Sequence, residues 1–348
     1  MTIRSRAEFD AAELAAVLSR YNLGAIHSVE KQLKGSRRSP KVVVEADGGR
    51  FLLKRRARGH DHPVKVAFSH AVQLYLQSKG FPLPKLIPVA DDDDTMVIIE
   101  DRLYEMFEYV PGETYTRTHS ETRDGGRILG HFHRLLMDYD TDWQPSRVGY
   151  HDAEMVRTNL HNIPETVGKD DSVIGKESEL FATVSGLYEA YESSCQRVED
   201  AGFLQWPDRL VHSDWHPGNM LFAKGHVRAV IDYDSLHKMP PVTDLANGLL
   251  QFSIIGGNTD PRLWPAELDA ERFGEFFEGY HENFKTEPRQ LSVLTSLMIE
   301  ALIAEAVAPI AATGSFGRIE GFRFLQMISR KVRWIEQNGR RLIDAYAS

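Results

Sequence analysis

The sequence is short of cysteine and of net positive charge. Cys195 is the single cysteine among 348 residues, so the chain can form no internal disulfide and no zinc site built on several cysteines. The 41 Lys and Arg residues face 50 Asp and Glu residues, giving a formal net charge of -9. Because proteins that hold nucleic acid by its phosphates carry excess basic charge, this balance disfavours a nucleic-acid partner. A reducing cytoplasm is the expected location.

Long uninterrupted apolar runs are also scarce. Residues 1–20 carry charges among their apolar positions, unlike the apolar core of a secretory signal. The most apolar late segment, residues 297–312, is interrupted by Glu300, Glu305 and Pro309, and we expect it to be too short to span a bilayer. The sequence therefore predicts a soluble cytoplasmic chain with no membrane partner.

Two common nucleotide-binding patterns are missing. The chain has no Gly-x-Gly-x-x-Gly, and Gly175-Lys176 is followed by Glu177, where a P-loop needs Ser or Thr. Residues 34–41 form a basic stretch that contains Gly35 and Ser36. Its composition suits a loop that covers phosphate, but it suits an ordinary solvated loop equally.

The strongest positive feature is a polar motif between short apolar segments. Residues 212–219 read His-Ser-Asp-Trp-His-Pro-Gly-Asn, and residues 231–234 read Ile-Asp-Tyr-Asp. Mg2+ prefers carboxylate and amide oxygens, so Asn219 and Asp232 are candidate metal ligands. Asp214 is a candidate base that takes a proton from an acceptor hydroxyl during phosphoryl transfer. The alternative is a Pro-Gly turn whose polar side chains only satisfy backbone groups.

Together with the later Asp244-Leu245-Ala246, these motifs resemble the aminoglycoside phosphotransferase and choline kinase family, and the resemblance covers most of the chain. It implies an α+β, bilobal, protein-kinase-like fold. The N-terminal lobe, residues 1–110, would contain an antiparallel sheet, bind the nucleotide and end in a hinge. The mostly helical C-terminal lobe, residues 111–348, would carry the catalytic loop and the acceptor site. The motif does not identify the acceptor.

The same resemblance implies the roles of the residues in the C-terminal motif. Asp214 would be the catalytic base, Asn219 and Asp232 would bind Mg2+, and Asp244 would support the lobe. The apolar segments at residues 210–211, 220–222 and 227–231 are predicted to be short strands that deliver these groups.

The resemblance also implies residues that bind ATP. Residues 42–45 and 50–54 read as a hairpin with a glycine turn, and Lys54 matches the family lysine that contacts the inner phosphates. Backbone groups of Glu108 and Val110 would read the adenine edge. Ser36, in the basic stretch before the hairpin, is a further candidate nucleotide contact.

One departure from the family pattern concerns Lys54. Kinases of this fold usually pair this lysine with a Glu on the following helix, but residues 64–79, the predicted helix, contain no Glu. His70 and Gln73 are its nearest polar candidates. A different partner, slow catalysis and a catalytically reduced protein all remain open.

Apolar periodicity predicts the other elements. Further strands are expected at residues 86–90, 96–100 and 103–110, and helices at residues 7–21, 123–137, 177–199, 269–284, 291–307 and 318–345. In the family, the last three helices build the acceptor pocket.

The sequence thus predicts an ATP-dependent, Mg2+-assisted kinase that acts on a hydroxyl of a small molecule such as an aminoglycoside, choline or homoserine. The acidic balance suits a cationic acceptor, although it suits solubility as well. An atypical protein kinase is an alternative, against which stands the missing Ala-Pro-Glu anchor after Asp232. A nucleotide-binding pseudokinase that acts as a regulator is another, motivated by the missing helix Glu.

Overall fold

The chain folds into two compact units. The computed structural model describes residues 7–30, 39–90, 94–141, 143, 149–168, 173–257 and 260–346, so Ser36 lies outside the described residues. The N-terminal unit comprises Met1–Thr114, Met220–Ala223 and Val227–Asp234, and the C-terminal unit comprises Tyr115–Asn219, Lys224–His226 and Ser235–Ser348. Each unit is described by itself.

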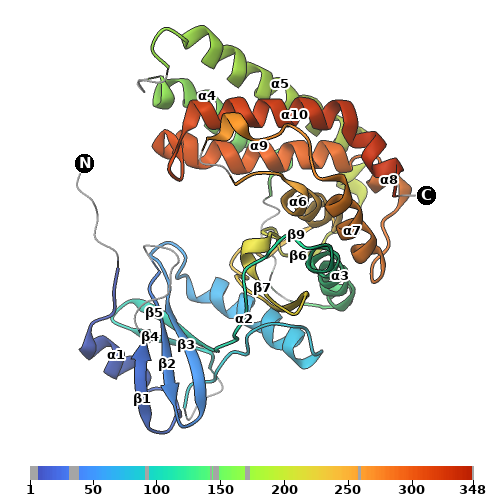
Figure 1. The fold of residues 1–348 in the computed structure, drawn as a ribbon. Helices are drawn as coiled ribbons and strands as arrows, with labels where there is room; N and C mark the ends of the chain where they lie inside the picture. The colour runs from blue at the N-terminus through green and yellow to red at the C-terminus, as the bar shows by residue number, and fades with distance from the viewer. Residues whose placement is uncertain are drawn as a thin grey trace. The chain divides into compact units, whose positions relative to one another are not determined.

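The N-terminal unit is built on a five-stranded antiparallel sheet of order β1-β2-β3-β5-β4 (Figure 1). Its elements are α1 (Ala11–Leu18), β1 (Ile26–Glu30), β2 (Lys41–Ala46), β3 (Gly49–Arg55), α2 (Pro63–Ser78), β4 (Met96–Ile99) and β5 (Arg102–Glu108). The predicted hairpin and helix are both present. The class is the expected α+β arrangement, with an antiparallel sheet here and helices in the C-terminal unit.

Alternating apolar residues create the core of this sheet. Val42 and Val44 on β2 are buried with Phe51 and Leu53 on β3, because every second residue of a strand points to the same face. Residues of α1 belong to the same core. That helix begins at Ala11 instead of the expected residue 7, since the Asp10 side chain accepts a hydrogen bond from the Glu13 N–H at 2.8 Å and caps it.

The strand expected at residues 86–90 is wrong. Only an isolated bridge between Leu86 and Phe107 forms there. The segment does lie along β5, since the Ile87 N–H donates to the carbonyl of Met106 at 2.9 Å. Pro84 and Pro88 have no N–H to donate, so a continuous ladder cannot develop.

A late segment of the chain returns to the N-terminal unit. It follows the hairpin of β7 (Met220–Ala223) and β8 (His226–Val230). The Val230 N–H donates to the Pro82 carbonyl at 2.9 Å, and the Ser69 hydroxyl on α2 donates to the Tyr233 carbonyl at 3.2 Å. These bonds fix residues 231–234 beside β3 and α2.

The C-terminal unit is mainly helical. Its principal elements are α3 (His119–Leu136), α4 (Glu154–Val167), α5 (Glu177–Asp200), β6 (Arg209–Val211), β9 (His237–Met239), α6 (Val242–Ser253), α7 (Ala270–His281), α8 (Pro288–Leu291), α9 (Leu294–Thr313) and α10 (Gly321–Asp344). Helix α9 packs against α4, α5, α6 and α10 (Figure 1). The sequence patterns did not predict α4, α6, α8 or β9.

The central helix α9 corrects one expectation. It has 20 residues and, within the described chain, is the one helix that is long and apolar enough to cross a membrane by length and composition. The expectation that this segment is too short is therefore wrong, because the helix starts at Leu294 and continues through Pro309. Within the structure, 67% of its most apolar window is buried. A core helix surrounded by other helices has the same apolar character.

Helices α3 and α7 approach each other closely at glycines. A Cβ at Gly126 would lie 2.1 Å from the carbonyl oxygen of Phe276, and one at Gly279 would lie 2.1 Å from the carbonyl oxygen of Arg123. These contacts are with backbone, which cannot move aside as a flexible side chain does. Glycine at these positions therefore permits the helix packing.

We expect Gly126→Ala to lower the free energy of unfolding by about 1–3 kcal/mol, the usual cost of overpacking. Gly186→Ala on α5 is the matched control, because a Cβ there meets nothing within 4 Å and alanine favours the helix. Denaturant unfolding of both variants checks this. Equal stability of the two variants would show that α3 and α7 do not pack as described.

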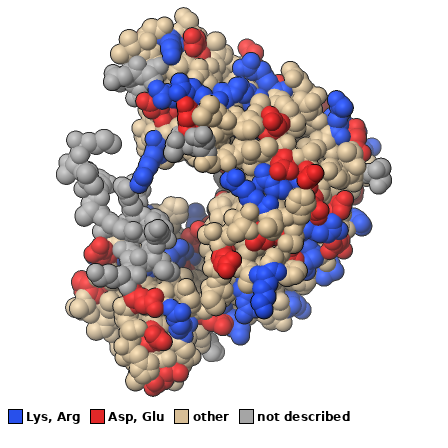
Figure 2. All heavy atoms as spheres, in the orientation of Figure 1, with Lys and Arg blue, Asp and Glu red and all other residues tan. Residues whose placement is uncertain are grey.

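Charge on the visible surface is mixed in sign. Figure 2 shows Lys and Arg side chains interspersed with Asp and Glu over the C-terminal unit. A binding face for nucleic acid would instead gather basic side chains into a patch or stripe. Among the described residues of this face, acidic side chains lie close to the basic ones.

Candidate functional site

A polar loop of the C-terminal unit joins β6 to β7 and is held by one buried carboxylate. Asp244, in the first turn of α6, accepts hydrogen bonds from the backbone N–H of His212 at 2.6 Å and of Ser213 at 2.8 Å. Ser213 has a φ of 63°, a left-handed conformation that a residue with a side chain adopts only when its surroundings require it. Asp244 therefore fixes the backbone immediately before Asp214.

Asp244 is itself anchored in the interior. It is 1% exposed, and its Oδ2 lies 3.2 Å from the Nε2 of His133 on α3. The other ring nitrogen of His133 lies 2.9 Å from the Tyr280 hydroxyl. Both nitrogens of this histidine thus serve the packing of the unit around the loop.

Asp214 is oriented by two neighbours in the same loop. The Asn219 amide Nδ2 donates to the Asp214 Oδ2 at 2.7 Å, and the His216 Nε2 lies 3.4 Å from the Asp214 Oδ1. Since the His216 Nδ1 accepts the Gly218 N–H at 3.0 Å, the proton of a neutral ring is on Nε2 and points to Asp214. The contact of His216 was missed in the sequence, where its position in the motif was the only signal.

Burial would raise the pKa of Asp214, but the hydrogen bond and charge of His216 and the bond from Asn219 outweigh it. The pKa of Asp214 is consequently below its ordinary value, and the side chain is an anion near neutral pH. An anionic oxygen beside an acceptor hydroxyl can receive its proton.

The amide nitrogen and the amide oxygen of Asn219 point in different directions. Its Nδ2 donates both to the Asp214 carboxylate and, at 3.0 Å, to the Asp214 backbone carbonyl. Both partners are acceptors, so the amide nitrogen must face them. The amide oxygen then points away from both of these acceptors, and an oxygen of this kind can bind a cation.

The N-terminal unit contains a separate cavity of about 70 Å3, lined by apolar and charged side chains together. Basic, amide and acidic side chains contribute to its lining, among them Lys41, Lys54, Gln73, Asp232 and Asp234. Small-molecule pockets usually measure about 300–1,000 Å3, so this cavity has room for part of a ligand only. Its adjacent ammonium and carboxylate groups suit a phosphate together with a cation.

Asp232 reaches this cavity from the segment after β8. Its φ is 70°, so Asp232, like Ser213, has left-handed backbone at a motif residue. Strain of this kind persists where the surrounding structure requires one particular backbone path. Here the hydrogen bonds of Val230 and Tyr233 on either side hold that path.

The partner of Lys54 is a strand residue. The Lys54 Nζ lies 3.0 Å from the Glu105 Oε1 on β5 and 3.5 Å from the Asp234 Oδ2. Burial would lower the pKa of Lys54, but the charges of Glu105 and Asp234 outweigh it and raise the pKa. The lysine remains charged, so the question left by the missing helix Glu is answered by a different partner.

Glu108 is the last residue of β5, and Val110 lies two positions later. The Glu108 N–H donates to the Lys85 carbonyl at 2.8 Å, and the Tyr109 N–H donates to the Arg50 carbonyl at 2.9 Å. The N–H of Glu108 is therefore already used. A ligand at this edge would meet the carbonyl of Glu108 and the backbone of Val110.

The structure thus brings the predicted residues together in two groups. Asp214 and Asn219 are hydrogen-bonded in the C-terminal unit, and Lys54 and Asp232 line one cavity in the N-terminal unit. Glu108 and Val110 belong to the N-terminal unit as well.

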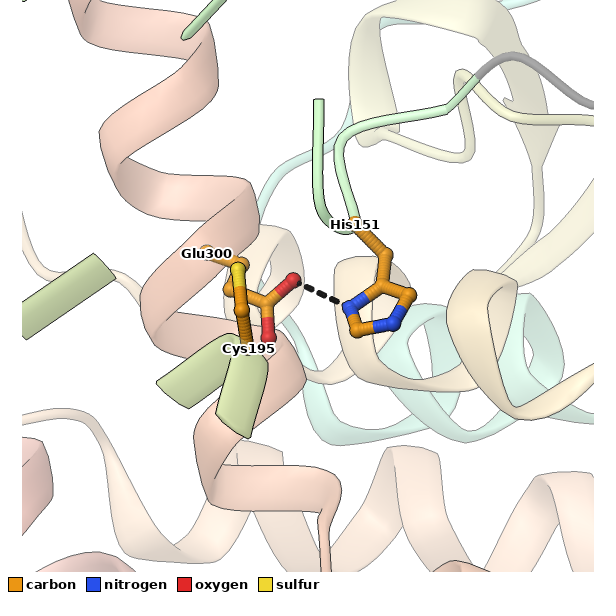
Figure 3. Close-up of side chains that lie close together, drawn as sticks. All are labelled: His151, Cys195 and Glu300. Atoms are coloured by element: carbon orange, nitrogen blue, oxygen red, sulfur yellow. Dashed lines mark hydrogen bonds and ion pairs between the residues drawn. The ribbon is translucent and has the colours of Figure 1, made fainter. Parts of the chain in front are cut away.

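A further buried cluster contains His151, Cys195 and Glu300 (Figure 3). These residue types can bind metal, but both ring nitrogens of His151 already face carboxylates, at 2.7 Å to Glu300 and 2.9 Å to Glu199. Burial, together with the charge of Glu300, raises the pKa of the Cys195 thiol to about 12. A protonated thiol is a poor metal ligand. The contacts of this cluster are those of a hydrogen-bonded core.

Comparison with known proteins adds a family match. The family model described as "Phosphotransferase enzyme family" matches residues 29–293. A curated relative, a homoserine kinase of Phenylobacterium zucineum, is 25% identical over 226 residues, which cover 64% of this chain and 62% of that protein. The match thus spans less than two thirds of the relative's length.

Solved structures share the fold at low identity. An aminoglycoside phosphotransferase from Alicyclobacillus acidocaldarius superposes with a TM-score of 0.71 at 15% identity, covering 99% of both chains. A microcompartment-associated aminopropanol kinase gives a TM-score of 0.69 at 16% identity, covering 96% of this chain and 98% of its own. An amicoumacin kinase in complex with AMP-PNP and Ca2+ gives 0.68 at 14% identity, covering 95% of this chain and 94% of its own.

Proposed function

Because the chain belongs to the phosphotransferase enzyme family, we propose that it is an ATP-dependent kinase that transfers the γ-phosphate to a hydroxyl of a small molecule. The observation that carries this proposal is the loop geometry. An anionic Asp214 is hydrogen-bonded to the amide nitrogen of Asn219, whose oxygen is left for a cation. Phosphoryl transfer requires such a base next to such a ligand.

We assign nucleotide binding to the N-terminal lobe, residues 1–110. Lys54 contacts the inner phosphates, supported by its position in a cavity of the N-terminal unit that Asp232 also lines. The carbonyl of Glu108 and the N–H of Val110 bind the adenine edge, since the N–H of Glu108 is used by Lys85. Ser36 is proposed as a phosphate contact from the resemblance alone.

Asn219 and Asp232 are the proposed ligands of Mg2+. Both offer oxygen donors, which this cation requires, and the orientation of Asn219 and the cavity position of Asp232 fit that role. When bound with the nucleotide, Mg2+ supplies positive charge against the phosphate oxygens. This proposal requires Asp214, Asn219 and Asp232 to converge on one nucleotide.

Side chains of this chain carry out the proton transfer and hold the catalytic loop. The Asp214 carboxylate accepts the proton of the acceptor hydroxyl as the hydroxyl oxygen bonds to the γ-phosphorus and the bond from that phosphorus to ADP breaks, while His216 and Asn219 donate to Asp214 and keep it oriented. Asp244 holds the loop backbone during this step.

The C-terminal lobe, residues 111–348, is proposed to bind the acceptor. Glu305 on α9 interacts electrostatically with both Asp214 and His216 and is hydrogen-bonded to Gln251 on α6. Burial raises the pKa of Glu305 to about 7, and a nearby cation favours the charged form of such a carboxyl. This arrangement favours an acceptor that carries a cationic nitrogen, as aminoglycosides, choline-like compounds and homoserine do.

We expect Glu305→Gln to raise the KM for a cationic acceptor about tenfold, in line with the loss of one charged contact. The KM for ATP should not change. Glu154→Gln on α4 is the control, because that side chain is 85% exposed. Steady-state kinetics with each substrate varied measures both constants. An unchanged KM for the acceptor would show that Glu305 does not contribute to acceptor binding.

A phosphate-transfer screen tests the proposal as a whole. The purified protein, Mg2+ and ATP are incubated with a panel of amino alcohols, aminoglycosides and sugars, and phosphorylated products are identified by mass spectrometry. Transfer to a member of the panel supports a small-molecule kinase. Transfer to protein substrates alone would favour an atypical protein kinase.

A pseudokinase is the other alternative. The missing helix Glu motivated it, and the pairing of Lys54 with Glu105 gives that lysine another carboxylate partner. Tight ATP binding without transfer to any acceptor would nevertheless indicate a pseudokinase in the same screen.

We further propose a soluble cytoplasmic protein whose partners are small molecules, with neither nucleic acid nor membrane among them.

A further inference from the structure

Glu105 is a charged residue in the interior of the N-terminal unit. It lies within β5 and is 0% exposed. Its Oε1 lies 3.0 Å from the Lys54 Nζ, and its Oε2 accepts hydrogen bonds from the Arg56 Nε at 3.0 Å and Nη2 at 2.9 Å. Burial of an ion in this way is unfavourable unless its partners are well placed, so the surroundings of Glu105 hold a carboxylate specifically.

The pairing of β3 with β5 determines which residue Glu105 meets. Lys54 and Glu105 are directly opposite one another in the register of the two strands. Opposite residues of an antiparallel pair point to the same face of the sheet, with their Cβ atoms about 5 Å apart. The ion pair is therefore a consequence of strand register and does not depend on the position of a helix.

Helix α2 contributes to this site through a histidine. The His70 Nε2 lies 2.8 Å from the Glu105 Oε2, and the His70 Nδ1 lies 2.7 Å from the Thr95 Oγ1. A Thr hydroxyl can donate to Nδ1, which leaves the proton on Nε2, facing the carboxylate. His70 is 1% exposed, so water does not compete for these bonds.

Arg56 and Asp234 complete the network. The Arg56 Nη2 also lies 2.8 Å from the Asp234 Oδ1, and Asp234 reaches Lys54 as well. The charges of Lys54 and Arg56 are thus shared between a fixed carboxylate on β5 and a carboxylate on the segment that carries Asp232. Lys54 thus contacts one carboxylate on β5 and another on the segment of residues 231–234.

We propose that Glu105 is the positioning residue for Lys54, so that a strand carboxylate fixes the lysine that binds the phosphates, while α2 supplies a hydrogen-bond donor, His70, to fix Glu105. This inference rests on the proposed function, since it assigns Lys54 to the nucleotide. One consequence is that strand register selects the partner of Lys54, whereas α2 acts on the pair only through His70.

The test is nucleotide affinity, which needs no knowledge of the acceptor. Calorimetric titration with AMP-PNP and Mg2+ compares the wild type with Glu105→Gln, which keeps the shape and removes the charge. We expect about tenfold weaker binding, the effect of one charged hydrogen bond. Glu45→Gln on β2, an exposed position, is the matched control and should bind as the wild type does.

A second variant separates a positioning role from a purely structural one. Gln73 on α2 lines the same cavity as Lys54, so the double variant Glu105→Gln, Gln73→Glu returns a carboxylate to the lysine from the helix. We expect it to recover part of the lost affinity. In the transfer assay, Glu105→Gln should raise the KM for ATP and leave the KM for the acceptor unchanged.

His70 provides an independent test if Glu105→Gln does not fold. His70→Leu removes the donor to Glu105 and should weaken AMP-PNP binding, whereas His70→Gln keeps a donor and should restore it. Affinity at the wild-type level in folded Glu105→Gln, or in His70→Leu where the former does not fold, overturns the inference. No AMP-PNP binding by the wild type overturns the proposed function itself, and with it this assignment.

Discussion

Replacing Asp214 with asparagine is expected to lower the rate of phosphate transfer about a thousandfold, within the usual range for loss of a general base. The substitution keeps the size of the side chain and an oxygen that can accept from the Asn219 Nδ2, which lies 2.7 Å away in the wild type. It removes the negative charge that receives the proton. The loop should therefore keep its conformation but lose its ability to accept the proton of the acceptor hydroxyl.

The measurements that check this are kcat with a saturating acceptor and the Kd for AMP-PNP with Mg2+. We expect kcat to fall and the Kd to stay within about twofold, since an interaction used mainly in the transition state affects kcat most. Asp200→Asn at the end of α5, an exposed position, is the control. Full activity of Asp214→Asn would refute the assignment of the base.

Asp232→Asn is expected to lower phosphate transfer more than a hundredfold and to raise the Mg2+ concentration needed for half-maximal activity. Asparagine tolerates the left-handed backbone found here, where φ is 70°. The backbone strain is therefore accommodated in the variant, and the principal change is the loss of one anionic ligand. Mg2+ binds carboxylates more strongly than amides because it is a small, hard cation.

A matched control for this variant exists in the same unit. Asp101, in the turn between β4 and β5, has a φ of 59° and is exposed, so Asp101→Asn makes the same chemical change on the same backbone conformation. It should leave the Mg2+ dependence unchanged. Manganese titration followed by electron paramagnetic resonance gives a readout without turnover, and equal metal affinity of Asp232→Asn and the wild type would exclude Asp232 as a ligand.

The local patterns of the chain were sufficient for much of the fold. The hairpin of residues 41–55 follows from alternating apolar residues around a glycine turn, and the long helices follow from their apolar spacing. Both signals are local, so the sequence carries them directly. The strand expected at residues 86–90 failed because proline removes the donors on which pairing depends.

The chemistry of the loop was also apparent in the sequence. Asp214 and Asn219 are five positions apart, and that short separation, with the turn of Pro217-Gly218 between them, brings their side chains into contact. The orientation of that contact was not apparent. It depends on the proton of His216 and on the hydrogen bonds of Asp244, which is 31 positions from Ser213 along the chain.

The partner of Lys54 was decided by tertiary structure alone. Glu105 is 51 positions from Lys54, and no local pattern favours it over the many other acidic residues. Strand register brings the two together, and register depends on how whole strands bury their apolar faces. The sequence therefore determined which groups are available for chemistry, whereas the pairing of β3 with β5 and the packing of α6 against the loop decided which of them meet.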